Sequence, residues 1–197
     1  MSSAVLSIGS NLGDRLAYLR SAVSALAPYL TAASPVFQTP PWGPVEQQPF
    51  YNAVLLVDDP EAGPSDWLDR AQACERAAGR VREQRWGPWT LDVDVIAVRN
   101  PTGGSDGGSS GDSSGARSGD SDGNSYGDSA GDVVSDDPRL TLPHPRAAER
   151  AFVLVPWWSV DPEAQLPGHG SVLQLMQALP AEEVAAVRLL PGLELRP

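Results

Sequence analysis

The order of the apolar segments is the feature that most narrows the possible folds of this chain. Short apolar runs typical of strands alternate with two longer segments in which apolar residues recur at helical spacing. The expected strands lie near residues 5–8, 34–37, 52–57 and 91–98, and the expected helices run from about 14 to 28 and from 64 to 78. This order is typical of a ferredoxin-like α+β fold, a two-layer sandwich in which helices pack on an antiparallel sheet.

Residues 100–137 interrupt this pattern. They hold ten of the 19 glycines, many serines and eight aspartates, and almost no large apolar side chain. Such a segment buries too little apolar surface to offset the entropy lost on ordering. We therefore expect one domain over 1–197 that carries a disordered insertion at 100–137, either a passive linker or a partner-binding loop. Beyond it we expect helices near 146–153 and 171–179 and a late strand over 184–190.

The charge of the chain is concentrated in the insertion. The net charge is −11, and the insertion contributes −7 of it through eight Asp and one Arg, which leaves −4 for the rest. That mild balance indicates neither nucleic acid nor an anionic membrane as a partner. No apolar run is long enough to span a bilayer, the N-terminus lacks the pattern of a signal peptide, and the single cysteine fits a reducing compartment. We expect a cytoplasmic monomer.

All 14 basic residues are arginines, and this limits how the chain could bind phosphate. A P-loop kinase needs a lysine that reaches the phosphates, so this class of enzyme is excluded. Any phosphate group must instead be bound by arginine side chains or by metal ions.

Asp92 and Asp94 are the first candidates for a functional site. Alternate residues of a strand point the same way, so both carboxylates share one face of the strand expected over 91–98. Two carboxylates about 7 Å apart repel unless a cation lies between them, and Mg²⁺ prefers oxygen ligands. The alternative is a solvent-facing strand that carries two acids without a ligand.

Three arginines precede this acid pair: Arg80, Arg82 and Arg85. In enzymes that transfer phosphoryl groups, cationic side chains bind the polyphosphate oxygens while carboxylates hold a metal ion. Arginines beside an acid pair fit this requirement. Trp86, in the same segment, could cover an adenine base or simply anchor its loop.

At this point the chain resembles a known family, the 6-hydroxymethyl-7,8-dihydropterin pyrophosphokinases. The matching segments are IGSNLG (8–13), TPPWGP (39–44), FYN (50–52), RWGPWTLDVD (85–94), LPHP (142–145) and RAF (150–152). They occur in the family's order and spacing apart from the insertion. The resemblance implies a ferredoxin-like fold and an ATP- and Mg²⁺-dependent transfer of pyrophosphate to the pterin alcohol, which releases AMP in a step of folate synthesis.

The resemblance also implies a role for each matching position. Asp92 and Asp94 would hold two Mg²⁺ ions, and Arg80 and Arg82 would act in catalysis with them. The pterin pocket would be formed by Thr39, Pro40, Trp42, Phe50, Asn52 and Phe152. The co-substrate ATP would be surrounded by Gln72, Glu75, Arg82, Trp86, Arg139, Thr141, His144 and Arg150.

Several of these residues have a plainer interpretation. The two phenylalanines could be ordinary core aromatics, and Asn52 could form a turn. Gln72 and Glu75 could belong to a solvated helix face, and His144 could be a structural histidine between two prolines.

Trp89 departs from the family pattern, which usually has an arginine at this position. Losing a cation that stabilises the transition state could cost on the order of 10²–10³ in rate. Arg85 could compensate, or Trp89 could stack on a substrate. Two rival functions therefore stay open: a catalytically weak relative that senses pterin or nucleotide, with the insertion as its interaction element, and a different Mg²⁺-dependent nucleotidyl or phosphoryl transferase.

Overall fold

The computed structural model describes residues 2–41, 47–80, 89–100 and 131–195. Three residues predicted to belong to the site, Trp42, Arg82 and Trp86, lie outside the described residues.

The described chain forms a mixed sequence of strands and short helices. In chain order the elements are β1 (Ser2–Ser10), α1 (Arg15–Leu26), β2 (Leu30–Ala33), β3 (Phe37–Thr39), β4 (Phe50–Asp59), α2 (Pro64–Ala77), β5 (Asp92–Asn100), β6 (Gly131–Asp132), β7 (Ser135–Asp137), β8 (Leu140–Leu142), the 3₁₀ helix η1 (Ala147–Glu149), α3 (Ala151–Val160), β9 (Gln165–Leu166), β10 (Gly170–Ser171), α4 (Val172–Ala178), α5 (Ala181–Ala185) and β11 (Arg188–Leu189). None of the helices in these residues combines the length and hydropathy needed to cross a bilayer.

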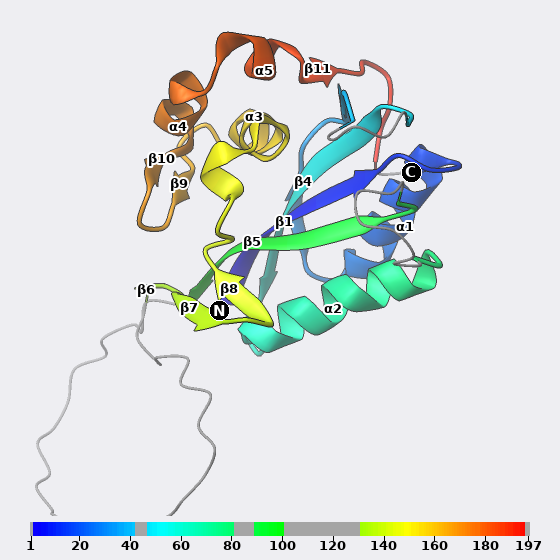
Figure 1. The fold of residues 1–197 in the computed structure, drawn as a ribbon. Coiled ribbons are helices and arrows are strands. Elements are labelled where there is room, and N and C mark those ends of the chain that lie inside the picture. Colours follow the sequence, from blue (N-terminus) through cyan, green and yellow to red (C-terminus); the bar gives the residue numbers. More distant parts are fainter. Residues whose placement is uncertain (1, 42–46, 81–88, 101–130, 196–197) are drawn as a thin grey trace, which may run out of the picture.

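The main sheet confirms the predicted ferredoxin-like fold. Its strand order is β11-β3-β4-β1-β5-β6, β2 also pairs with β4, and all of these pairs are antiparallel. The helices α1 and α2 cover one face of the sheet, while α3, α4 and α5 lie on the other side (Figure 1). The predicted two-layer sandwich is therefore present, and the C-terminal helices cover part of its second face.

The two faces of the sheet have separate apolar cores. Leu55 of β4 packs in the cluster that includes α1 and α2, whereas its neighbour Val54 packs in the cluster that includes α3. The same alternation holds on β5, where Val93 and Val95 belong to the α1–α2 side. Asp92 and Asp94 consequently share the opposite face, as predicted from the strand period.

A register shift between β1 and β5 changes this alternation next to the acid pair. The partner of Val5 is Ala97 and the partner of Leu6 is Val95, so Ile96 is an extra residue on β5. Ile96 and Ala97 both pack on the α3 side. The face that carries the two aspartates is therefore apolar at Ile96 and Ala97 and polar before them.

The predicted boundaries of two segments, the insertion and the late strand, are wrong. The insertion was predicted over 100–137, but residues 131–132 pair with β5 and residues 135–137 pair with β8. Val133 lies between these two strands and is buried, and its N–H donates to the carbonyl of Val98 at 2.9 Å. This apolar burial and the backbone hydrogen bonds to the neighbouring strand hold the segment 131–137 on the folded domain. The late strand is confined to β11, because α5 takes up residues 181–185.

Candidate active site

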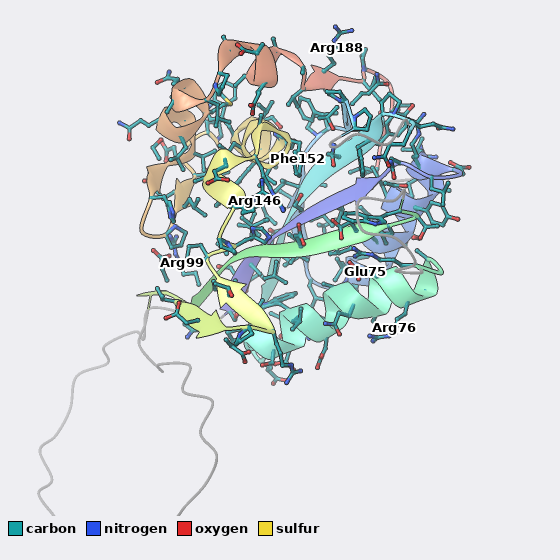
Figure 2. The ribbon with its side chains drawn as sticks, viewed as in Figure 1. Glu75, Arg76, Arg99, Arg146, Phe152 and Arg188 are labelled. Carbon is teal, nitrogen blue, oxygen red and sulfur yellow. The ribbon has the colours of Figure 1, made fainter. Side chains whose placement is uncertain are left out.

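One large cavity lies along the polar part of the sheet face that carries the aspartates. Its volume is about 940 Å³, and it is lined by residues of β1, β4, β5, α2, β8 and α3. Figure 2 shows Glu75 on α2 and Phe152 on α3, with β5 passing between them. The cavity walls include every predicted site residue that the structure describes: Thr39, Pro40, Phe50, Asn52, Gln72, Glu75, Arg80, Asp92, Asp94, Arg139, Thr141, His144, Arg150 and Phe152.

We call the part of the cavity that contains Glu75, Arg80, Asp92, Asp94 and Arg150 the charged half. Arg80 follows the end of α2, and its Nη1 lies 2.6 Å from Asp92 Oδ1 and also contacts Glu75 Oε1. Arg80 is held deeply, with only 8% of its side chain exposed. Its buried Nε has no hydrogen-bond partner among the residues that the structure describes.

Glu75 is fixed by the edge of the sheet as well as by Arg80. Its Oε1 accepts a hydrogen bond from the backbone N–H of Val93 at 3.0 Å. Glu75 is therefore a buried structural partner of β5, and the plainer interpretation of it as part of a solvated helix face is wrong.

Asp94 is held by residues that follow β8. Its Oδ2 accepts a hydrogen bond from Arg150 Nη1 at 2.9 Å and lies 3.9 Å from His144 Nε2. The backbone N–H of His144 donates to the carbonyl of Ile96 at 2.8 Å, which fixes this segment beside β5. Both aspartates thus have an arginine partner on the same sheet face.

The surroundings in the charged half disfavour the ionised form of Asp92 and the protonated form of His144. Burial raises the pKa of Asp92 to about 7, with smaller contributions from the Asp94 and Glu75 carboxylates, while Arg80 acts in the opposite direction. Burial also lowers the pKa of His144, helped by the charges of Arg150 and Arg146 and opposed by Asp94. A cation added beside Asp92 would therefore favour the ionised form of this carboxyl group.

We call the part of the cavity that contains Thr39, Phe50, Asn52, Trp89 and Phe152 the neutral half. Asn52 is buried, and its Nδ2 donates to Thr39 Oγ1 at 2.8 Å. The rings of Phe50 and Trp89 meet edge to face, with 6.5 Å between their centroids. These residues present flat apolar surfaces and amide and hydroxyl groups without a net charge.

Gly9 of β1 gives the Asn52 side chain its room. The two residues are partners across the β1–β4 pair, and a Cβ atom at position 9 would come within 2.8 Å of Asn52 Oδ1. Any larger residue at position 9 would displace the amide into the cavity.

Two arginines connect the halves of the cavity. Arg80 pairs with Asp92, and its guanidinium lies over the Trp89 ring at 4.7 Å from the centroid. Arg150 pairs with Asp94, and its guanidinium lies 5.5 Å from the centroid of the Phe152 ring. Each aspartate is therefore linked to an aromatic ring through one arginine.

The predicted residues Arg139 and Thr141 lie at the rim. They belong to the hairpin of β7 and β8, where the backbone N–H of Arg139 donates to Asp137 Oδ1 at 2.8 Å. Arg139 is exposed and Thr141 is half-buried, so both face the opening of the charged half.

Asn11 is a residue that the sequence analysis missed. It is buried just beyond β1; its Nδ2 donates to Gln47 Oε1 at 2.8 Å, and its Oδ1 accepts from the backbone N–H of Trp89 at 2.7 Å. It thereby connects two segments that border the neutral half. Its place in the matching segment 8–13 was a signal, but nothing local indicated these distant partners.

Known proteins are similar to this chain over most of its length. The model of the family described as 7,8-dihydro-6-hydroxymethylpterin-pyrophosphokinase (HPPK) matches residues 5–162. Proteins named 2-amino-4-hydroxy-6-hydroxymethyldihydropteridine pyrophosphokinase are similar over almost the whole chain. The one from Mycobacterium tuberculosis (strain ATCC 25618 / H37Rv) is 46% identical over 96% of this chain and 90% of its own length. The one from Mycobacterium leprae is 48% identical over 96% and 89%, and the one from Pseudomonas aeruginosa is 32% identical over 95% and 96%.

Solved structures support the fold alone. A crystal structure of HPPK-DHPS from Plasmodium falciparum superposes with a TM-score of 0.55 at 10% identity, covering 89% of this chain and 45% of that one. This chain thus spans less than half the length of that protein. From the family match and the relatives' identity over nearly their full length, the chain belongs to the 7,8-dihydro-6-hydroxymethylpterin-pyrophosphokinase family.

Proposed function

We propose that this protein transfers the pyrophosphoryl group of ATP to 6-hydroxymethyl-7,8-dihydropterin, giving AMP and the pterin diphosphate, a step of folate biosynthesis. The observation that carries the proposal is the single cavity in which a charged half and a neutral half adjoin. A triphosphate suits the first half and a flat heterocycle suits the second. The relatives' names describe the same reaction.

The charged half fits ATP together with Mg²⁺. Asp92 and Asp94 offer carboxylate oxygens from one face of β5, and Mg²⁺ is usually bound by one or two carboxylates, waters and substrate phosphates. Among the described residues, no group of three or more His, Cys, Asp or Glu is arranged to hold a metal ion. Two ions held by this pair would complete their coordination with phosphate oxygens, and they would neutralise charge on the triphosphate.

Arginines and carboxylates would exchange partners when the two ligands enter. Arg80 and Arg150 are the ionic partners of Asp92 and Asp94, respectively. Phosphate oxygens give these arginines new acceptors, and the carboxylates are then available to the metal. We therefore expect Mg²⁺ and ATP to bind together much more tightly than either binds alone.

The neutral half would hold the pterin. Phe50 and Phe152 supply apolar ring surfaces, and Asn52 supplies amide groups for the polar edge of the heterocycle. A pterin in this half would lie next to the charged half, where its hydroxymethyl group would have to meet the triphosphate.

The transfer itself needs no protein nucleophile. The hydroxyl oxygen bonds to the β-phosphorus, the bond from this phosphorus to the α-β bridging oxygen breaks, AMP leaves with the electron pair, and the hydroxyl proton is lost. The protein contributes by holding the two reactants in line and by compensating charge.

A product assay tests the proposal. The protein is incubated with ATP, Mg²⁺ and the reduced pterin, and the nucleotide product is identified by chromatography. We expect AMP in equal amount to the pterin diphosphate. ADP would indicate ordinary kinase chemistry, and pterin binding without turnover would indicate a sensor; either result would overturn the proposal.

We further propose that the protein acts as a cytoplasmic monomer. Sedimentation equilibrium at the concentration of the assay tests the oligomeric state, and a mass twice that of the chain would contradict it.

A further inference from the structure

Trp89 occupies a fixed position where the two halves of the cavity meet. Its backbone is held from both sides by Asn11, whose Oδ1 accepts from the Trp89 N–H and whose own N–H donates to the Trp89 carbonyl at 3.1 Å. The residue is half-buried and lines the cavity. Its ring is therefore presented to the cavity by an anchored backbone.

The ring of Trp89 contacts one residue from each half. On the neutral side it meets Phe50 edge to face at 6.5 Å, with 77° between the ring planes. On the charged side it lies against the guanidinium of Arg80, 4.7 Å from the ring centroid. An indole face attracts a cation most strongly among aromatic rings, and the attraction grows when the pair is shielded from water.

Arg80 depends on such support. Its side chain is long, and Glu75 and Asp92 hold it at its terminal Nη1. Its Nε is buried without a hydrogen-bond partner among the described residues, so no polar contact seen there fixes the middle of the side chain. The Trp89 ring supplies an apolar and weakly negative surface against the guanidinium.

We propose that Trp89 is a positioning residue that holds the Arg80 guanidinium beside Asp92, and that it does not itself contact phosphate. The inference deepens the proposed function and rests on it for the identity of the substrates. A tryptophan at this position adds no further positive charge beside Arg80.

Four variants at two positions separate these roles. Trp89→Leu removes the ring, Trp89→Phe keeps an aromatic face, Trp89→Arg introduces a cation, and Arg80→Lys removes the guanidinium. Trp158→Leu on the exposed side of α3 serves as the matched control. Thermal unfolding of each variant verifies that it folds.

The kinetic result should identify the positioning role. We expect Trp89→Leu to lower kcat about tenfold with a change of less than about threefold in the KM for ATP, because the placement of Arg80 matters most as charge develops in transfer. Trp89→Phe should retain most of the wild-type kcat, and Trp89→Arg should be at least as slow as Trp89→Leu because two guanidinium groups repel. Trp89→Leu should have little further effect in the Arg80→Lys background. A Trp89→Arg variant as fast as the wild type, or additive effects in the double variant, would overturn the inference.

A spectroscopic measurement tests the same contact without substrates. The Arg80 Nε–H signal, identified by its loss in Arg80→Lys, should be shifted by the ring current of Trp89 in the ligand-free protein. We expect the shift to persist in Trp89→Phe and to disappear in Trp89→Leu. An unchanged signal in Trp89→Leu would refute the contact. If the wild type made no AMP while this signal behaved as expected, the proposed function would fail and the contact would stand.

Discussion

The charged half and the neutral half of the cavity are prepared for their ligands in different ways. In the neutral half, Asn52 and Thr39 already bond to each other and the Phe50 and Trp89 rings already pack, so a flat ligand enters a formed surface. In the charged half, Asp92 and Asp94 are each paired with an arginine, and ATP and Mg²⁺ must separate these pairs in order to bind. The comparison suggests that pterin affinity depends on shape, whereas ATP affinity depends on an exchange of ionic partners.

Both halves are built from adjacent strands of one sheet face. β4 contributes Phe50 and Asn52, and β5 contributes Asp92 and Asp94, with β1 between them. Because the same rigid sheet carries both sets, removing a side chain from one half should leave the geometry of the other half intact. Each prediction below uses this separation.

The largest effect should come from the charged half. Asp94→Ala removes a proposed metal ligand and leaves Arg150 without its carboxylate partner, so we expect AMP formation to fall by on the order of 10³ or more. Pterin affinity, measured by fluorescence titration, should change much less, by up to about threefold, because the only link to the neutral half among the described residues is Arg150, which pairs with Asp94 and lies against the Phe152 ring. Asp69→Ala, on the exposed side of α2, is the matched control. A variant that kept most of its activity would remove the metal assignment.

The neutral half should respond in the opposite way. Phe152→Ala removes a ring surface, and stacking on an aromatic side chain contributes about 1–3 kcal/mol for a nucleobase, so pterin affinity should fall about 5- to 150-fold. ATP affinity should change little. Titrations with each ligand separately provide the measurement. Equal losses of ATP and pterin affinity would contradict the separation of the halves.

The sequence predicted which residues form the site better than it predicted the contacts between these residues. The strand period placed Asp92 and Asp94 on one face, and the matching segments identified the residues that surround them. Periodicity is a local property, however, and the partners of Asn11 lie 36 and 78 residues away. The contact of Trp89 with Arg80 likewise depends on where the end of α2 meets β5, which no local pattern specifies.

Substitution of Asn11, which lies at the border between the two halves, should have a smaller effect than the substitutions of Asp94 and Phe152, and it should act on stability. Asn11→Ala removes the side-chain bonds to Gln47 and Trp89 and leaves the buried N–H of Trp89 without an acceptor. We expect the free energy of unfolding to fall by about 1.5 kcal/mol, measured by urea denaturation. Asn11→Asp keeps one acceptor and should lose less. A loss confined to pterin affinity, with unchanged stability, would mean that Asn11 acts only on the ligand.

The raised pKa of Asp92 predicts that the stability of the protein depends on pH. Burial raises this pKa from 3.8 to about 7, so between these pH values the folded protein binds a proton that the unfolded chain has released. The free energy of unfolding of the ligand-free protein, relative to Asp92→Asn, should therefore decrease as pH rises through this window and level off above it. Urea unfolding in the presence of a chelator provides the measurement. A relative stability that rose with pH would show that Arg80 outweighs burial.

The smallest effect on ligand binding should follow replacement of residues 101–130 by a two-residue turn. Asn100 of β5 and Gly131 of β6 are direct partners in the antiparallel pair, so an Asn-Gly turn can join them without moving either strand. A shorter connection has a smaller closure entropy, and we expect the free energy of unfolding to rise by no more than about 2 kcal/mol, with both affinities unchanged. Replacement of 101–137 is the matched comparison, because it also removes β6, the buried Val133 and the strand that pairs with β8. It should lower stability and weaken ATP binding through Arg139 and Thr141, while the neutral half still binds pterin. If both replacements behaved alike, residues 131–137 would not belong to the folded domain.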